Sequence, residues 1–184
     1  MEIIEIECSQ INLKENRELN LCLGFFDGLH IGHRKIISSA VKLGHTGVMT
    51  FDVPPSFALG KNIVNSCLTS LYDKNNLLSK LGVEYLYVLR MSKELLEMDK
   101  DSFINKVLKK INPKSIFVGD DYRFGHNAEG TPEYLSKFFT VKVFDQITEN
   151  GKKISSHTIR DLVRDGNVKE VAHFLTQNYT INAC

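Results

Sequence analysis

The stretch Gly24-Phe25-Phe26-Asp27-Gly28-Leu29-His30-Ile31-Gly32-His33 decides the fold and the chemistry of this chain. It follows residues 19–23, an apolar run that predicts a buried strand, and it leads into residues 34–43, where apolar side chains recur at helical spacing. A glycine-rich turn that opens a helix exposes the first amides of the helix at the positive end of its dipole. Such a turn binds phosphate, and His30 and His33 are spaced so that both rings face one anion.

The composition is typical of a soluble globular protein of one domain. The chain has 184 residues, of which 42% are hydrophobic and 24% charged, which is enough to bury a core. With 23 basic and 22 acidic side chains, no bulk charge favours nucleic acid or a membrane surface as a partner. No apolar run approaches the length of a membrane span, and the first residues are acidic where a signal peptide is basic.

The cysteines point to a reducing compartment. Cys8, Cys22, Cys67 and Cys184 are scattered along the chain and form no Cys-x-x-Cys pair. Neither a disulfide framework nor a zinc site is therefore expected, and we expect a cytoplasmic protein.

Strand-like and helix-like segments alternate along the chain. Strands are expected over residues 19–23, 46–51, 84–89, 114–118 and 141–144, with an edge strand in the first ten residues. Helices are expected over residues 34–43, 68–81, 92–111, 157–165 and 168–175, with a short helix that starts at 131–133. We expect a break near residues 99–102, with Ser102 or Asp101 as the cap of the second half. This alternation predicts an α/β fold, a doubly wound parallel sheet with helices on both faces.

Three unusual segments follow strands of this sheet, at the end where such folds bind ligands. They are the histidine turn, Asp52-Val53-Pro54-Pro55, and Gly119-Asp120-Asp121-Tyr122-Arg123-Phe124-Gly125. We expect them to converge on one cleft. In the last segment the two acids suit a magnesium ion or a ribose hydroxyl, and Tyr122 and Phe124 suit stacking on a flat ring. The alternative for these aromatic side chains is a well-packed turn with Phe124 in the core.

Ser155-Ser156-His157-Thr158-Ile159-Arg160 is the second strong signal. A serine pair at a helix start offers hydroxyls and free amides, and Arg160 lies one turn further on. These groups suit the outer phosphates of a nucleoside triphosphate, with the guanidinium forking across two oxygens. The alternative is a plain helix cap followed by a surface arginine; the histidine turn favours the phosphate site.

Together these motifs resemble the N-terminal, FMN-adenylylating domain of the bacterial bifunctional riboflavin kinase/FAD synthetases. The matching stretches are residues 24–33, 68–70 with Lys74, 118–125, 154–160 and the tail 166–181. The first motif is shared by the wider nucleotidyltransferase superfamily, whereas Tyr-Arg-Phe-Gly and the tail indicate the flavin branch. The resemblance implies a Rossmann-like fold of the nucleotidyltransferase type, one domain over residues 1–184, without the riboflavin kinase domain.

The resemblance also implies an activity: transfer of AMP from ATP to the phosphate of FMN, which gives FAD and pyrophosphate by in-line displacement. The implied catalytic residues are His30, His33 and Arg160. The implied ATP-binding residues are Gly24, Phe25, Phe26, Gly28, His30, His33, Ser155, Ser156 and Arg160. The implied FMN-binding residues are Asp52, Pro54, Pro55, Phe57, Asp121, Tyr122, Arg123 and Phe124. Magnesium is expected to be bridged by phosphates, without dedicated protein ligands, and Asp27 to brace the turn.

Two positions depart from the family pattern. The family has Thr-Phe-x-Pro-His-Pro near the flavin, where this chain has Thr50-Phe51-Asp52-Val53-Pro54-Pro55 and no histidine. This change affects flavin positioning more than triphosphate binding. His157 occupies a position that is usually threonine, a milder change in the helix start.

Three other functions stay open on the sequence alone. His-x-Gly-His is also the signature of class I aminoacyl-tRNA synthetases, and Met91-Ser92-Lys93 is similar to their lysine-bearing loop, although it comes too early in the chain. A related adenylyl- or cytidylyltransferase with another small phosphorylated acceptor fits the altered flavin loop. A non-catalytic flavin or nucleotide sensor would keep the same fold.

Overall fold

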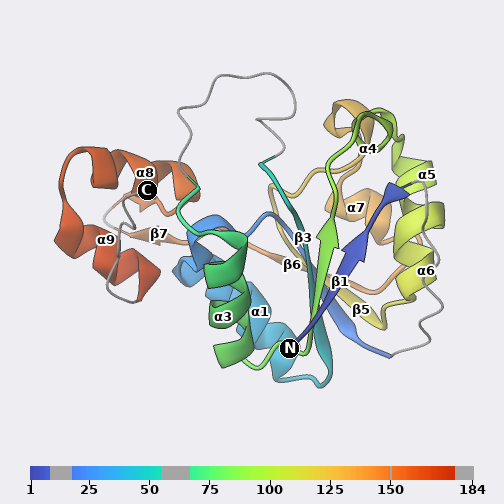
Figure 1. The fold of residues 1–184 in the computed structure, drawn as a ribbon, viewed down its shortest axis with the longest axis horizontal. Coiled ribbons are helices and arrows are strands. Elements are labelled where there is room, and N and C mark those ends of the chain that lie inside the picture. The colour runs from blue at the N-terminus through green and yellow to red at the C-terminus, as the bar shows by residue number, and fades with distance from the viewer. Residues whose placement is uncertain (9–17, 55–66, 150, 177–184) are drawn as a thin grey trace.

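The computed structural model describes residues 1–8, 18–54, 67–149 and 151–176 (Figure 1). Its centre is a six-stranded sheet in which every neighbouring pair is parallel, in the order β1-β4-β3-β2-β5-β6. The strands are β1 Glu2–Ile6, β2 Asn20–Leu23, β3 Thr46–Phe51, β4 Tyr85–Leu89, β5 Ser115–Gly119 and β6 Val141–Phe144. The α/β fold with a parallel sheet is confirmed, as is the edge strand near the N-terminus.

The direction of winding reverses at β2. From β2 the chain proceeds to β3 and β4 on one side, and then crosses to β5 and β6 on the other. β2 therefore lies between β3 and β5, and the crevice beyond the carboxyl ends of β2 and β5 is the topological switch point of the sheet. The histidine turn leaves β2 at this point.

Helices cover both faces of the sheet, as predicted (Figure 1). The helical elements are η2 Asp27–Leu29, α1 Ile31–Val41, α3 Leu71–Lys80, α4 Lys93–Glu97, α5 Lys100–Phe103, the π-helical turn η3 Ile104–Leu108, α6 Lys109–Ile111, η4 His126–Ala128, α7 Pro132–Leu135, α8 Ser156–Arg164 and α9 Val168–Leu175. No helix in these described ranges is long and apolar enough to cross a membrane.

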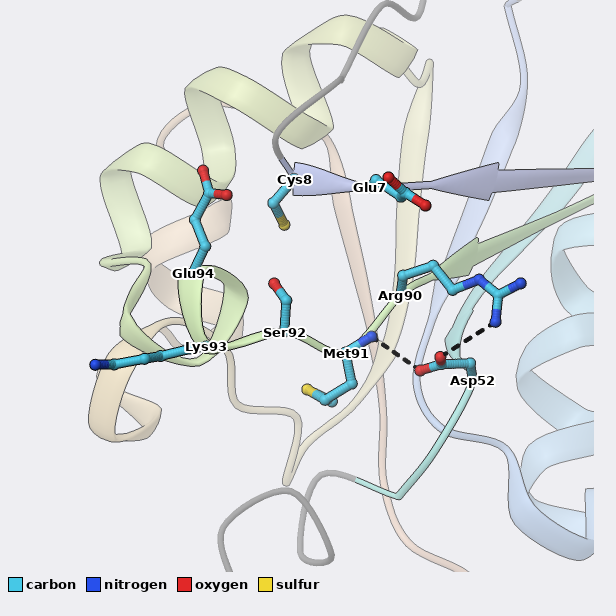
Figure 2. A pocket seen from close by; sticks show the side chains of 8 residues that line it. All are labelled: Glu7, Cys8, Asp52, Arg90, Met91, Ser92, Lys93 and Glu94. Atoms are coloured by element: carbon cyan, nitrogen blue, oxygen red, sulfur yellow. Dashed lines mark hydrogen bonds and ion pairs between the residues drawn. The ribbon is translucent and has the colours of Figure 1, made fainter.

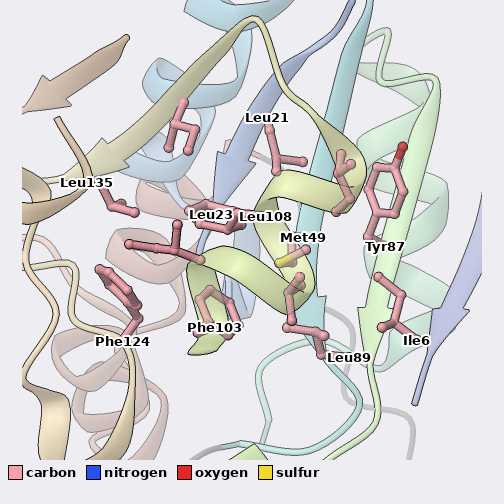
Figure 3. Close-up of a cluster of buried hydrophobic side chains, with 14 of the residues drawn as sticks. Ile6, Leu21, Leu23, Met49, Tyr87, Leu89, Phe103, Leu108, Phe124 and Leu135 are labelled. Atoms are coloured by element: carbon pink, nitrogen blue, oxygen red, sulfur yellow. The ribbon is translucent and has the colours of Figure 1, made fainter. Parts of the chain in front are cut away.

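Side chains alternate between the two faces along each strand, which creates two hydrophobic cores. Leu21 and Leu23 of β2 pack with the helices from α4 to α7 (Figure 3), whereas Cys22 packs with α1 and α3. Because the side-chain period of a strand is two, a strand buried on both faces appears as a continuous apolar run. A third core joins α8 and α9 to Leu68 and Ile154.

Several details differ from the expected elements. Asp99, rather than Ser102 or Asp101, caps α5: its Oδ1 accepts hydrogen bonds from the backbone N–H groups of both those residues at 2.9 Å. The extended backbone at Asp99 lets its carboxylate reach the second and third amides of the helix, which is the geometry of an N-cap. The hairpin of β7 Thr148–Glu149 and β8 Lys152–Lys153 is absent from the expected elements, because two-residue strands are too short for a periodic pattern.

The core beneath α1 generates a stability prediction. Ile37 is fully buried between α1 and the sheet, whereas Leu43, just after the same helix, is 55% exposed. Ile37→Ala should lower the free energy of unfolding by roughly 2–5 kcal/mol through lost burial and a residual cavity. Leu43→Ala should change it by less than about 0.5 kcal/mol. Urea unfolding measures both, and equal effects of the two substitutions would contradict this packing.

Candidate active site

The turn between β2 and α1 has an unusual backbone. Phe26 has φ 53°, Gly28 φ 77° and Leu29 φ 46°, so left-handed residues cluster within one short segment. For residues with a Cβ this conformation costs free energy and persists only when the surroundings enforce it. The side chains of Phe26 and Leu29 are buried in the core under α1, and a Cβ on Gly28 would collide with Leu68. The turn is therefore held by packing on its inner side.

The two histidines of the motif stack on each other. Their ring centroids lie 3.6 Å apart at an interplanar angle of 23°. His30 caps α1, since its Nδ1 accepts a hydrogen bond from the His33 backbone N–H at 3.4 Å. A neutral His30 therefore carries its proton on Nε2, where it can donate to a ligand. The Nδ1 of His33 is buried and has no hydrogen-bond partner among the described residues.

Both imidazoles are neutral at pH 7. Burial lowers the pKa of His30 to about 4, although the nearby carboxylates of Asp27 and Asp121 act in the opposite direction. Burial also lowers the pKa of His33 well below its usual value, and the charges of His30 and Lys74 lower it further. The pair thus offers neutral hydrogen-bond donors and acceptors.

Asp27 joins this turn to two distant segments. Its carboxylate is 2% exposed; Oδ2 accepts a hydrogen bond from Nη2 of Arg160 at 2.6 Å, and Oδ1 accepts one from the backbone N–H of Thr69 at 3.1 Å. The Asp27 backbone carbonyl accepts a hydrogen bond from Oγ of Ser156 at 2.8 Å. Asp27 therefore braces the turn, as predicted, and it fixes the start of α8 against the histidine pair.

A cavity of about 200 Å³ lies at the switch point, between the histidine turn and the start of α8. His30, Gly32, His33, Ser155 and Ser156 line it, so the paired imidazoles and the serine pair share one pocket, in line with the prediction. The other lining residues are Ile36, Gly119, Asp121, Phe144, Asp145, Gln146, Ile147, Lys153 and Ile154. Free amides at a helix start and two imidazole rings suit the binding of a polyphosphate.

The remaining residues of the expected ATP site do not line this cavity. Arg160 is bonded to Asp27, which does not line the cavity either, and Phe26 is buried in the core. The backbone carbonyl of Phe25 is already used, because it accepts hydrogen bonds from Thr50 and Lys74. Gly24 packs closely against the ring of Phe26, and Gly28 packs on Leu68. These residues shape the turn from behind the lining.

The three loops expected to form one cleft border three cavities instead. Asp121 lines the cavity of the histidine pair, and Arg123 and Phe124 line a second cavity of about 630 Å³ together with Phe51. Asp52 lines a third cavity, of about 550 Å³. All three loops follow the carboxyl ends of their strands, and the second and third cavities share Met91 and Lys93.

The aromatic pair in the loop after β5 is part of the core. Phe124 is only 7% exposed, and the half-buried Tyr122 stacks on it with ring centroids 5.9 Å apart. Burial raises the pKa of Tyr122. The packed-turn alternative therefore describes both residues, while Phe124 also lines the second cavity. Pro54 follows Asp52 in the described chain, whereas Pro55 and Phe57 lie outside the described residues.

Asp52 lies just before Val53 and Pro54, the two residues at which this segment departs from the family pattern, and it holds the segment in place (Figure 2). Its Oδ1 accepts hydrogen bonds from the backbone N–H groups of Val53 and Met91, both at 2.9 Å. Its Oδ2 lies 3.6 Å from Nη1 of Arg90, which also binds Glu5. The carboxylate ties the end of β3 to the end of β4.

Sequence reasoning assigned no role to two lysines of this region, although it named Lys74 among the residues that match the family. Lys153 lines the first cavity and pairs with Asp121 at 3.3 Å, in the short hairpin that no pattern predicted. Lys74 is buried on the inner face of α3 and reaches the turn. A signal for it existed, because Lys74 occupies the apolar stripe of that helix together with Leu71 and Leu78.

Comparison with known proteins identifies the family. A family model described as FAD synthetase matches residues 12–158. The chain belongs to this family. Membership removes the aminoacyl-tRNA synthetase alternative and agrees with the motifs that line the switch-point cavity.

Individual relatives support the same family. The chain is 34% identical to a bifunctional riboflavin kinase/FMN adenylyltransferase of Listeria monocytogenes, over 87% of this chain and 54% of that protein. It thus spans about half of that relative's length. A crystal structure described as a macrolide-efflux protein from Streptococcus pneumoniae superposes with a TM-score of 0.86 at 30% identity, over 97% of this chain and 72% of the other. Pantothenate synthetase from Thermus thermophilus shares the fold, with a TM-score of 0.56 at 14% identity, over 96% and 81% of the two chains.

The Asp27–Arg160 pair generates a prediction for stability. Asp27→Asn keeps the shape of the side chain but leaves Arg160 facing a neutral group in a buried position, which should cost about 3 kcal/mol of unfolding free energy. Asp161→Asn, on the exposed face of α8, should cost about 1 kcal/mol or less. Chemical denaturation compares the two variants. A loss for Asp27→Asn no larger than that of the surface control would show that the pair does not hold α8 in place.

The histidine pair generates a prediction for pH dependence. Because the folded pKa of His30 is about 4 and its ordinary value is 6.5, the unfolded chain binds more protons between these values. Stability should therefore fall as the pH drops from 6.5 to 4, with about 3 kcal/mol of the loss due to His30. His30→Asn keeps a cap acceptor and should remove this part of the loss, whereas His157→Asn at the surface should not. Unfolding midpoints across this pH range test it; an unchanged slope in His30→Asn would contradict it.

Proposed function

We propose that this chain transfers AMP from ATP to the phosphate of FMN, forming FAD and pyrophosphate. The observation that carries the proposal is the cavity that the stacked histidines share with Ser155 and Ser156, in a member of the FAD synthetase family. The net charge of +1 supports small-molecule substrates over nucleic acid. A cytoplasmic location is part of the proposal.

The proposed chemistry needs no protein base. An oxygen of the FMN phosphate, already ionised at neutral pH, attacks the α-phosphorus of ATP in line, and pyrophosphate leaves. Catalysis then rests on positioning and on stabilising the charge of the transition state. The neutral imidazoles of His30 and His33 donate hydrogen bonds to the triphosphate, and the amides at the start of α8 hold its outer phosphates.

Arg160 supplies fixed positive charge next to this site. Its guanidinium stays bonded to Asp27 and is mostly buried, so it is oriented before ATP arrives. Magnesium enters as part of the ATP substrate. Asp121 and Asp145 line the cavity and would offer carboxylate oxygens to such an ion.

The cavity beside Phe124 is the proposed flavin side of the site. It lies past the ends of β3 and β5, and Phe51, Leu95, Phe103 and Phe124 give it apolar walls, with Arg123 at its edge. A flat aromatic ring fits such walls. Asp121, in the same loop as Arg123 and Phe124, lines the neighbouring phosphate cavity. The second candidate function is transfer of AMP to another phosphorylated acceptor. Two observations favour it: residues 50–55 lack the family's histidine, and Asp52 in this segment is used to bind the backbone of Met91.

An enzyme assay tests the proposal. Purified protein with FMN, ATP and magnesium should lose flavin fluorescence as FAD forms, and His33→Ala should lower the rate roughly 100- to 1,000-fold by removing one donor to the developing charge. His45→Ala serves as the control and should keep full activity. His45 precedes β3 at the amino ends of the strands, whereas the cavity lies at their carboxyl ends.

Parallel reactions separate the alternatives. One set of reactions replaces ATP by CTP, and another replaces FMN by other phosphorylated acceptors. Product in these reactions, but not with ATP and FMN, would identify a related transferase. Tight flavin binding without any product would identify a sensor. Full activity of His33→Ala would contradict the role of the histidine pair.

A further inference from the structure

Lys74 is a charged side chain that is only 2% exposed. Its ammonium donates hydrogen bonds to the backbone carbonyl of Phe25 at 2.6 Å and to Oγ1 of Thr50 at 3.1 Å. It also lies 4.1 Å from the centroid of the Phe25 ring. Among the described residues, no carboxylate lies at ion-pair distance from it. Burying an ammonium without a carboxylate at ion-pair distance is costly, so this position has a reason other than stability.

The carbonyl that Lys74 binds stands at the entrance of the strained turn. Thr50 donates to the same oxygen at 2.9 Å, so Phe25 accepts from α3 and from β3 at once. The next residue, Phe26, has the left-handed φ of 53°. Two donors on one carbonyl fix the peptide that connects β2 to the histidine turn, from the side opposite to the cavity.

The ammonium also adds charge beneath the histidine pair. The titratable groups around it are Asp27 on η2, His33 on α1 and Cys67 before α3, with Arg160 on α8 facing the same carboxylate. Since Asp27 pairs with Arg160 at 2.6 Å, two cations share one buried anion. Both cations therefore place positive charge near a cavity suited to polyphosphate.

We propose that Lys74 is a positioning residue of the adenylyl transfer: it fixes the Phe25 carbonyl and supplies positive potential to the triphosphate without touching it. This inference rests on the proposed function for its catalytic part. Its electrostatic part concerns the ligand-free protein, so the two can fail separately.

NMR titration of the ligand-free protein tests the electrostatic part. Because the Lys74 charge lowers the pKa of His33, Lys74→Met should raise that pKa toward the ordinary histidine value. Lys80→Met removes an exposed charge from the same helix, and Leu78→Ala removes a buried apolar contact from it. Neither control should move the His33 titration, although Leu78→Ala should lower stability.

Kinetics tests the catalytic part. Lys74→Met should lower kcat/KM for ATP at least about tenfold and change the KM for FMN little, because the lost charge lies under the triphosphate. Burial lowers the pKa of Lys74 to about 8, whereas Asp27 and Cys67 raise it. In the wild type, kcat/KM for ATP should therefore decline as the pH rises through about 8, and Lys74→Met should lack this decline.

Each result decides the matter. Should Lys74→Met fail to fold, the wild-type protein still allows a direct titration of the lysine Nζ by NMR, and a value near the ordinary pKa of about 10.4 would overturn the inference. An unmoved His33 titration or an unchanged kcat/KM for ATP in a folded Lys74→Met would overturn it too. If the wild type forms no FAD while the His33 titration moves as expected, the proposed function fails and the electrostatic link stands.

Discussion

The buried carboxylate of Asp27 connects parts of the chain that are more than a hundred residues apart. The carboxylate accepts hydrogen bonds from the backbone N–H of Thr69, before α3, and from the guanidinium of Arg160 in α8. The backbone carbonyl of Asp27 accepts one from the hydroxyl of Ser156. A charge at 2% exposure is tolerated only when hydrogen bonds and an opposite charge compensate its lost hydration. The histidine turn, the entry to α3 and the start of α8 therefore form together. The switch-point cavity exists because these three segments are held at this one side chain.

The two histidines that line this cavity at the start of α1 are neutral imidazoles, because burial prevents them from taking up a second proton at pH 7. The cations Arg160 and Lys74 lie behind the lining, each bonded to the turn that carries the histidines. The imidazoles keep one protonation state, and the two cations are held by hydrogen bonds. Such groups are preorganised for a transition state that gains negative charge, because none of them has to reorient as that charge develops.

The proposed flavin side of the site is held by a separate set of contacts. Asp52 binds backbone amides and Arg90, so the loop after β3 is tied to the loop after β4. The cavity at Phe51 and Phe124 lies next to this connection, with the stacked Tyr122 anchoring the loop after β5 in the core. The family's histidine is replaced in a segment that the protein uses as a structural tie. In the proposed reaction, acceptor choice is thus the property most affected by this replacement.

The sequence by itself determined the parallel α/β architecture, its strands and most of its helices, because burial on both faces of a sheet leaves continuous apolar runs at regular intervals. It also predicted the residues of the switch-point cavity, since His30, His33, Ser155 and Ser156 belong to local motifs whose helix starts and glycines act over a few residues. Only the tertiary structure decided which loops share a cavity, that Arg160 is bonded to Asp27, and that Lys74 reaches the Phe25 carbonyl. The cap at Asp99 and the hairpin of β7 and β8 were also decided there. These contacts join residues whose geometry depends on how the elements pack, which no local pattern of residues records.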